Sequence, residues 1–200
     1  MSEHSLIYLV FKMKRAEQTR LKIERTALRL FAEKGVDQTT TKDLALGAEI
    51  AEGTIYRHFE SKEALVRHMF QAHYLPLGEE LDRLQSGQVG VRAKLSVMCA
   101  RFCELFDSDP DLYRFLFFVQ HGQVEKLPSE ATTAVTVIGA VLNEAMERGE
   151  IPQRDQALVS AWILGVVTQP AVFHIYGRLS GPLSDHAAEI SDACWRLISA

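Results

Sequence analysis

Residues 40–62 constrain the fold of this chain more than any other stretch, because they hold two short helical patterns with a break between them. Thr40 is a favourable N-cap residue, and Asp43 three positions later completes a pattern like a capping box. Leu44 and Ala48 continue at helical spacing and predict one apolar face. The first pattern therefore predicts a short amphipathic helix.

A second helical pattern follows in a new phase. Ile55 and Phe59 lie four residues apart, so they share one helix face and can pack against the first helix. The positions that then face outward carry small or polar side chains: Glu52, Gly53, Thr54, Tyr56 and Arg57. Small residues permit close approach to another surface, and the hydroxyl of Tyr56 and the guanidinium of Arg57 suit phosphates or base edges. Together the two patterns predict a helix-turn-helix.

A more specific resemblance is carried by linked motifs in and around this stretch. Residues 53–59 (GTIYRHF) and 61–65 (SKEAL) resemble the DNA-binding signature of the TetR family of bacterial repressors, and residues 31–35 (FAEKG) with 39–40 are similar to its lead-in. The resemblance is strongest over about residues 20–70, and several motifs in order are more specific than one. It implies an N-terminal DNA-binding head and a C-terminal helical domain for ligand binding and dimerisation.

Three positions depart from the usual pattern of that family. Glu49 stands in the turn where glycine is common, and a left-handed backbone there would be strained. Ala51 stands where serine often caps the second helix, and the loss of such a cap costs about 0.5–2 kcal/mol. Glu52 stands where lysine is common, so it lowers non-specific DNA affinity, or it accepts a hydrogen bond from a cytosine amino group.

Helical periodicity continues along the chain without strand alternation or repeats, so we predict an all-α fold with about nine helices. Residues 1–60 form the predicted DNA-binding domain. Residues 61–200 form the predicted regulatory and dimerisation domain, with the fourth helix, from residue 61, as connector. Besides the helix-turn-helix pair, the expected helices span about 16–34, 61–84, 91–106, 110–122, 128–148, 153 or 155 to 179, and 184 to the C-terminus.

The charge distribution fits a DNA-binding front end although the net charge is −4. Residues 1–60 contain 10 Lys and Arg against 9 Asp and Glu, whereas residues 61–200 contain 12 against 17. We find no apolar run long enough to span a membrane and no signal-peptide pattern, so we expect a cytoplasmic protein. Residues 1–11 match no element of the family: either they pack on a partner, or Met13 is the natural start.

These observations predict a DNA-binding transcriptional regulator, most simply a ligand-responsive repressor that binds a palindromic operator as a dimer. Thr54, Tyr56 and Arg57 are expected to contact bases, and Gly53 permits close approach. The residues expected to position the DNA backbone are Thr40, Thr41, Lys42, Tyr56, His58 and Lys62. The alternative is an activator, or a regulator controlled by a protein partner rather than by a small molecule.

The last two predicted helices are apolar on most sides, as in residues 161–167 (AWILGVV), so they need cover on most sides. The family resemblance implies that a homodimer formed through these helices supplies it. We also predict a pocket for a small apolar or aromatic effector. Its candidate residues are aromatic or apolar, or polar on apolar helices: Met98, Phe102, Phe115, Phe118, Gln120, His121, Trp162, Gln169, Phe173, His174 and Tyr176. For any single one, a place in the core is the commoner outcome.

The sequence contains no pattern for catalysis, for a metal or for a cofactor. It has no G-x-S-x-G, P-loop or C-x-x-C motif, and His68 and His73 are poorly spaced for one helix face. Cys99, Cys103 and Cys194 are expected to be reduced, buried thiols. We therefore predict that the chain is not an enzyme. A small helical enzyme or carrier with a vestigial head is the third alternative.

Overall fold

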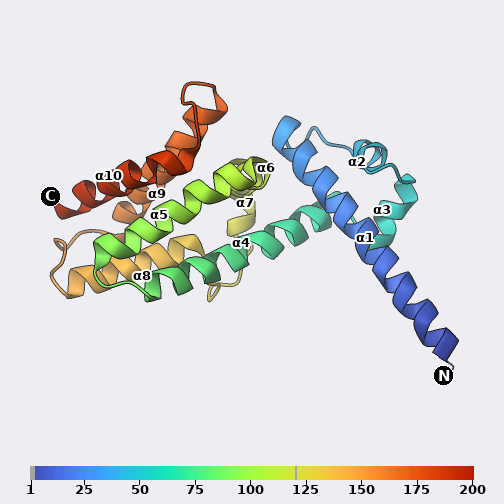
Figure 1. Ribbon diagram of the computed structural model, residues 1–200, viewed down its shortest axis with the longest axis horizontal. Helices are drawn as coiled ribbons and strands as arrows, with labels where there is room; N and C mark the ends of the chain where they lie inside the picture. The colour runs from blue at the N-terminus through green and yellow to red at the C-terminus, as the bar shows by residue number, and fades with distance from the viewer. Residues whose placement is uncertain (1–2, 120) are drawn as a thin grey trace. The chain divides into compact units, whose positions relative to one another are not determined.

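The computed structural model of the chain describes residues 3–119 and 121–200, with side chains described from Lys14 onward except at positions 119 and 121. Over these residues the fold is all-α and contains no strand (Figure 1). The helices are α1 (Glu3–Lys34), α2 (Thr41–Gly47), α3 (Glu52–His58), α4 (Lys62–Ser86), α5 (Val91–Ser108), α6 (Pro110–Arg114), the π-helical turn η1 (Phe115–Val119), α7 (His121–Val124), α8 (Ala134–Glu147), α9 (Gln156–Ile175), the 3-10 turn η2 (Leu183–His186) and α10 (Ala187–Ser199). The all-α prediction is confirmed.

Helix α1 is longer than the sequence analysis predicted. It begins at Glu3 rather than near residue 16, because no glycine or proline interrupts residues 3–34. It ends as predicted at Gly35, which has φ +85° and donates its N–H to the Phe31 carbonyl at 3.0 Å. The side chains of residues 3–13 lie outside the described residues, so both alternatives for that segment stay open.

The predicted bounds of two helices in the middle of the chain were wrong. The expected helix 110–122 is divided into α6, η1 and α7. The helix expected from residue 128 begins only at Ala134, because Thr133 and Thr136 form a capping box there. The Pro-Ser-Glu sequence at 128–130 resembles a helix start, but it forms a turn instead.

The last helix also begins later than predicted. Ser184 was expected to be its N-cap, but residues 183–186 form η2, and α10 starts at Ala187. The backbone N–H groups of Leu183 and Ser184 donate to the carboxylate of Asp107 on α5, at 2.7 and 2.8 Å. Asp107 is distant in sequence, so no local pattern could predict this cap.

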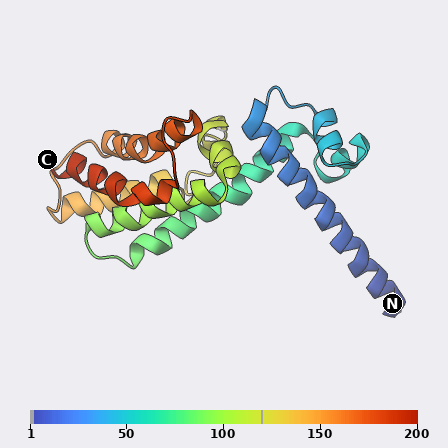
Figure 2. The same cartoon turned by 45° about the horizontal axis from the view of Figure 1, so that its top comes forward.

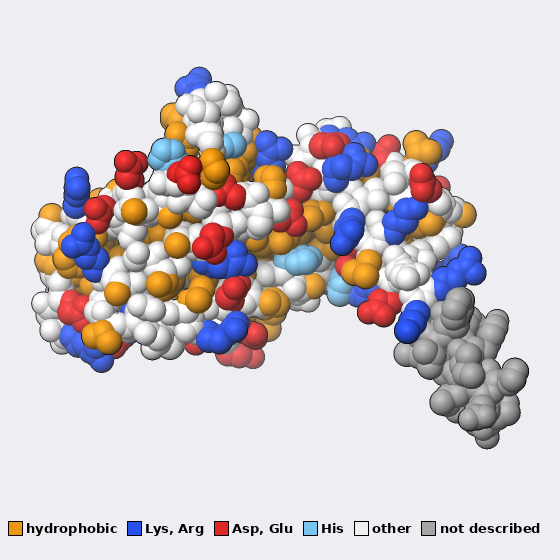
Figure 3. Space-filling view, in the orientation of Figure 1, with side chains coloured by type: hydrophobic (Ala, Val, Ile, Leu, Met, Phe, Trp, Pro, Cys, Tyr) orange, Lys and Arg blue, Asp and Glu red, His pale blue; other side chains and the backbone are white. Residues whose placement is uncertain are grey.

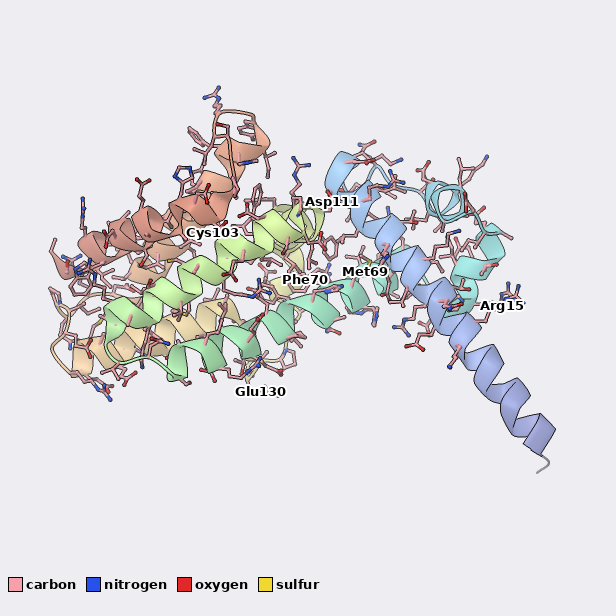
Figure 4. The ribbon with its side chains drawn as sticks, in the orientation of Figure 1. Arg15, Met69, Phe70, Cys103, Asp111 and Glu130 are labelled. Atoms are coloured by element: carbon pink, nitrogen blue, oxygen red, sulfur yellow. The ribbon has the colours of Figure 1, made fainter. Side chains whose placement is uncertain are left out.

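The described chain divides into two compact units, of which unit 1 comprises Met1–Gln71 and Arg114–Gln123. The side chains of its core are at most 5% exposed: Ile23, Ala27, Phe31, Leu44, Ile55, Phe59, Leu65, Met69, Phe70 and Phe115. Met69 and Phe70 are labelled on α4 in Figure 4. Phe31 stacks on Phe115 with ring centroids 6.0 Å apart, so η1 belongs to the core that supports α1.

Unit 2 comprises Ala72–Tyr113 and Val124–Ala200. Its central helix is α5, which packs against α8, α9, α10 and η2. The long helices of this unit run alongside one another in both ribbon views (Figures 1 and 2). Leu95, Met98 and Phe102 on α5 are almost fully buried in the core that these helices enclose.

Helix α9 is exposed along one apolar face. Its buried residues lie on one side: Val159, Ser160, Ile163, Val167 and Ala171. At 100° per residue the opposite side carries an exposed stripe, named here the α9 stripe: Leu158, Ala161, Trp162, Gly165, Gln169, Phe173 and Tyr176. Most of these side chains are apolar or aromatic, so the stripe lacks the polar surface of an ordinary solvent-facing helix.

The same helix corrects the expectation that no segment could span a membrane. Gln156–Ile175 is long and apolar enough to do so by length and composition. Gln169 and His174 interrupt its apolar residues, so it does not stand out as an uninterrupted run. A core helix of a soluble protein meets the same criterion, and the buried side of α9 already packs within unit 2.

Gly78 in α4 provides a test of the packing in unit 2. A Cβ at this position would clash with the backbone of Thr132 and Thr133. Because backbone yields less easily than a side-chain tip, we expect Gly78→Ala to lower the free energy of unfolding by about 2 kcal/mol, although alanine favours helices. Gly87→Ala, where a Cβ makes only an ordinary contact with Leu84, is the matched control. Urea denaturation of both variants would contradict this packing if they were equally stable.

Candidate functional site

The first helix of the helix-turn-helix is fixed at its N-terminus by a capping box. Thr40 Oγ1 accepts a hydrogen bond from the Asp43 N–H at 3.1 Å, and the Asp43 carboxylate accepts one from the Thr40 N–H at 2.8 Å. Lys34 donates to the same carboxylate at 2.9 Å. The hydrogen bonds from Lys34 and Thr40 hold the pKa of Asp43 well below its usual range. The predicted cap is confirmed, and Leu44 and Ala48 are fully buried as predicted.

The turn between α2 and α3 contains the strained residue that the sequence pattern suggested. Glu49 has φ +51° and is the one non-glycine residue of the described chain with a positive φ. This backbone costs a residue with a Cβ roughly 1–2 kcal/mol. Its carboxylate pairs with Lys22 at 2.8 Å, and that hydrogen bond lowers the pKa of Glu49. Because the pair is exposed, it offsets only part of the strain.

The N-cap residue of α3 is Ala51, which supplies no side-chain cap, as the sequence predicted. A serine here would place an acceptor beside the unpaired N–H groups of the first turn. We therefore expect Ala51→Ser to raise the free energy of unfolding by about 1 kcal/mol. Ala72→Ser, within α4, is the control, since a mid-helix serine supplies no cap. Equal urea midpoints for Ala51→Ser and wild type would contradict this prediction.

The outward face of α3 holds the residues predicted to contact bases. Tyr56 is 53% exposed. Glu52, Gly53 and Arg57 are also exposed, and Thr54 is half-buried. Arg57 Nη2 donates to Thr54 Oγ1 at 2.9 Å, so the guanidinium lies along the helix. A Cβ at Gly53 would meet nothing within 4 Å, so this face is open to an incoming surface.

The N-terminus of α2 adjoins this face. The Tyr56 hydroxyl donates to Thr41 Oγ1 at 3.4 Å, and Thr41 Oγ1 donates to Glu52 Oε1 at 2.8 Å. Thr40 and Lys42 are exposed at the same end of α2. We name the combined set the α2–α3 surface: Thr40, Thr41, Lys42, Glu52, Gly53, Thr54, Tyr56 and Arg57.

The two remaining predicted contact residues are held by the protein itself. His58 is half-buried at the last position of α3. Lys62 Nζ donates to the carbonyl oxygens of Val36 and Thr39, at 2.9 and 3.0 Å. Lys62 therefore fixes the loop before α2. A phosphate contact by Lys62 would use its third N–H or replace one of these bonds.

The C-terminal end of α3 is held by residues that the sequence patterns did not reveal. The Arg20 guanidinium lies 5.2 Å from the centroid of the Phe59 ring, and the His68 ring lies 5.6 Å from it. Glu24 Oε1 is 3.1 Å from both Arg20 Nε and His68 Nε2. These residues come from α1 and α4, and the four-residue spacing of Arg20 and Glu24 is the one local signal for the cluster.

Positive charge on unit 1 is partly neutralised by neighbouring acids. Lys and Arg side chains are spread over its surface in Figure 3. Four of them form ion pairs: Arg20 with Glu24, Lys22 with Glu49, Arg29 with Glu33 and Lys34 with Asp43. Within the described residues, Lys42 and Arg57 form no ion pair, so both remain available to phosphates.

The sequence that forms this surface matches a known family. Residues 23–69, from α1 into α4, match the profile of bacterial regulatory proteins of the tetR family. Residues 23–69 are thus a TetR-family domain. The relatives named below are transcriptional regulators.

The chain is 32% identical over 82 residues to the HTH-type transcriptional repressor KstR2 of Rhodococcus jostii, and this match covers 41% of this chain and 40% of that protein. It is 22% identical over 165 residues to the fatty acid metabolism regulator protein of Bacillus subtilis, covering 78% and 84%. The crystal structure of the transcriptional regulator FadR from Bacillus subtilis in complex with stearoyl-CoA has the same fold, with TM-score 0.75 at 19% identity over 87% of this chain and 96% of that one. The first curated relatives are matched over only 20–40% of their own length.

Part of the predicted effector pocket lies in unit 1. Phe115 is fully buried against Phe31, and Phe118 is half-buried in η1. Gln120 and the side chain of His121 lie outside the described residues. Phe115 therefore has a core contact that accounts for its burial without a ligand.

The other candidates lie in unit 2 in different environments. Met98 and Phe102 are 2% and 1% exposed on α5. Trp162, Gln169, Phe173 and Tyr176 belong to the α9 stripe. His174 Nε2 lies 2.8 Å from the Gly181 carbonyl oxygen, and its ring packs edge-on against Phe106 at 5.0 Å. The polar atom of His174 thus already has a partner in the protein.

An open cleft of about 500 Å³ in unit 2 is lined by none of the predicted effector residues. Its walls come from the N-terminal end of α5, Glu150 and α10: Val89, Gly90, Val91, Arg92, Ala93, Ser96, Glu150, Ala188, Ser191, Asp192 and Trp195. Arg92 pairs with Asp192 at 2.8 Å and lies 5.9 Å over the Trp195 ring. Glu150 accepts a hydrogen bond from the Val91 N–H at 2.8 Å, so each charged side chain of the cleft already has a partner.

The three cysteines are buried and free of disulfides, as predicted. Cys103, labelled on α5 in Figure 4, is fully buried, and burial raises its pKa to about 11. A thiol with so high a pKa is a poor nucleophile near neutral pH. Within the described residues, no cluster of three His, Cys, Asp or Glu could hold a metal ion.

Proposed function

We propose that this regulator is a repressor that binds a palindromic operator as a homodimer and releases it when a small apolar or aromatic effector binds. The observation that carries the proposal is the exposed α2–α3 surface, where small and hydrogen-bonding side chains stand on a rigid pair of helices. The proposed site of action is the cytoplasm, where the operator lies.

The α2–α3 surface supports separate roles for its residues. Thr54, Tyr56 and Arg57 face outward on the second helix, the helix that enters the major groove in this motif. Thr40, Thr41 and Lys42 stand at the N-terminus of α2, where backbone N–H groups and a lysine suit phosphates. In this division, His58 and Lys62 act mainly by holding the end of α3 and the loop before α2.

The α9 stripe supports the homodimer. Exposure of a row of apolar and small side chains along a 20-residue helix to water is unfavourable. Covering this row with an identical row lowers the free energy. A two-fold interface is self-complementary, so one stripe can pack on its copy. Gly165 and Ala161 are small enough to permit close helix approach. In the proposed dimer α10 lies beside α9 and forms the edge of the interface.

The nature of the effector is proposed from the apolar interior of unit 2. The stearoyl-CoA complex of FadR makes long-chain acyl-CoA the first class to test, and aromatic compounds are the second. To release DNA, the effector must bind the DNA-incompetent state more tightly, and each tenfold loss of operator affinity requires about 1.4 kcal/mol of such preference.

The test is a selection of genomic fragments by the purified full-length chain, followed by titration of acyl-CoA and aromatic compounds into the protein–DNA complex. We expect inverted repeats with half-site centres about 10 base pairs apart or a multiple of it. We also expect one compound class to reduce binding. Failure to enrich any sequence would overturn the DNA-binding role. Enrichment with no response to either class would favour control by a protein partner, and increased transcription from the bound promoter would favour an activator.

A further inference from the structure

Glu52 occupies an unusual place for an acid. It is the first residue of α3, on the α2–α3 surface, and its side chain is exposed. A carboxylate there repels the phosphates of bound DNA and weakens non-specific binding. The nearby acids Asp43 and Glu49 each pair with a lysine. Within the described residues, Glu52 forms no ion pair, so its charge is not neutralised by the protein.

The Glu52 side chain has a hydrogen-bond partner on α2 that favours one orientation. Its Oε1 atom accepts a hydrogen bond from Thr41 Oγ1 at 2.8 Å, and that hydroxyl accepts one in turn from Tyr56 at 3.4 Å. No hydrogen bond within the described chain engages Oε2. One oxygen therefore anchors the carboxylate to α2, and the other remains available as an acceptor on the exposed surface. A side chain fixed in this way loses less entropy when it binds than a mobile one does.

We propose that Glu52 determines operator sequence by accepting a hydrogen bond from the exocyclic amino group of a cytosine in the major groove. This inference rests on the proposed DNA-binding function. The first residues of the second helix are those that contact base edges in this motif. Among the donors that the major groove presents, the cytosine N4 amino group is the one that pairs with Asp or Glu. The hydrogen bond to a cytosine at that position compensates for the repulsion between Glu52 and the phosphates. A thymine presents an acceptor oxygen there, which repels the carboxylate as well.

A purely structural role for Glu52 makes a different prediction. An acid in the first turn interacts favourably with the helix dipole, and it ties α3 to Thr41 whether or not DNA is present. That role affects stability and the general level of DNA affinity. It cannot alter which base is preferred at one operator position, so base preference separates the two roles.

The decisive experiment compares base preference for wild type and Glu52→Gln on the selected operator, with each position of one half-site varied in turn. Glutamine keeps the size and an acceptor oxygen, but its amide pairs best with adenine. We expect wild type to prefer cytosine about tenfold at one position per half-site, and the variant to lose that preference or to transfer it to adenine. Thr41→Val, which removes the anchoring hydroxyl, is expected to reduce the same preference partially.

Glu60→Gln is the matched control. It removes the same charge from an exposed residue of unit 1 just beyond the end of α3. Both glutamine variants are expected to strengthen binding to random DNA, but only Glu52→Gln should change the base profile. An unchanged profile for Glu52→Gln would overturn the inference and leave the proposed function standing. If wild type selects no sequence at all, the proposed function fails first, so the two failures are distinguishable.

Discussion

Replacing Tyr56 and Arg57 together by alanine is expected to weaken operator binding by about 10³-fold while leaving the fold intact. Both side chains are exposed on α3 and contribute nothing to the core of unit 1. If each residue supplies about 1 kcal/mol in each half-site, a dimer loses about 4 kcal/mol, which is close to 10³-fold. The hydrogen bonds lost within the protein, to Thr41 and Thr54, join exposed side chains and stabilise little.

The measurement is operator affinity by fluorescence anisotropy at several salt concentrations, with circular dichroism to verify the helical content. The salt dependence should become shallower, because the loss of Arg57 removes one phosphate contact or base contact per subunit. Arg83→Ala is the control, since Arg83 is exposed on α4 within unit 2. Operator affinity that survives the double substitution would mean that α3 is not the recognition helix.

The helix-turn-helix could be predicted from sequence because its determinants are local. The Thr40–Asp43 box lies within four residues, and the buried spacing of Ile55 and Phe59 lies within five. The left-handed backbone at Glu49 was likewise indicated by the glycine that the turn usually carries. Each of these features needs only its immediate neighbours to form, so a pattern in the sequence is enough to reveal it.

Features that depend on distant residues could not be predicted in this way. The cap of η2 comes from Asp107, and both carbonyl partners of Lys62 lie in the loop between α1 and α2. Helical spacing also cannot distinguish a pocket residue from a core residue. Met98 and Phe115 have equivalent apolar patterns, yet Met98 lies in the core of unit 2 and Phe115 stacks in unit 1. The effector pocket therefore remains a proposal.

Trp162→Glu is expected to convert the proposed dimer into a monomer at micromolar concentration. Trp162 is 38% exposed on the α9 stripe, so glutamate at this position can remain solvated in an isolated subunit. In a two-fold interface the substitution occurs twice. Loss of about 2 kcal/mol of apolar burial per tryptophan raises the dissociation constant about 10³-fold, and the buried charge raises it further. Sedimentation velocity measures the change directly.

Val89→Glu controls for the charge and for the loss of an apolar side chain, because Val89 is 92% exposed in the turn before α5 and is not part of the α9 stripe. The two variants should unfold at similar urea concentrations when both are compared as monomers. Operator affinity should fall for Trp162→Glu alone, because one α3 contacts only half of a palindrome. If Trp162→Glu sediments as wild type does, the α9 stripe is covered by something other than a second copy. A dissociated variant that retained full operator affinity would instead show that DNA binding does not require dimerisation.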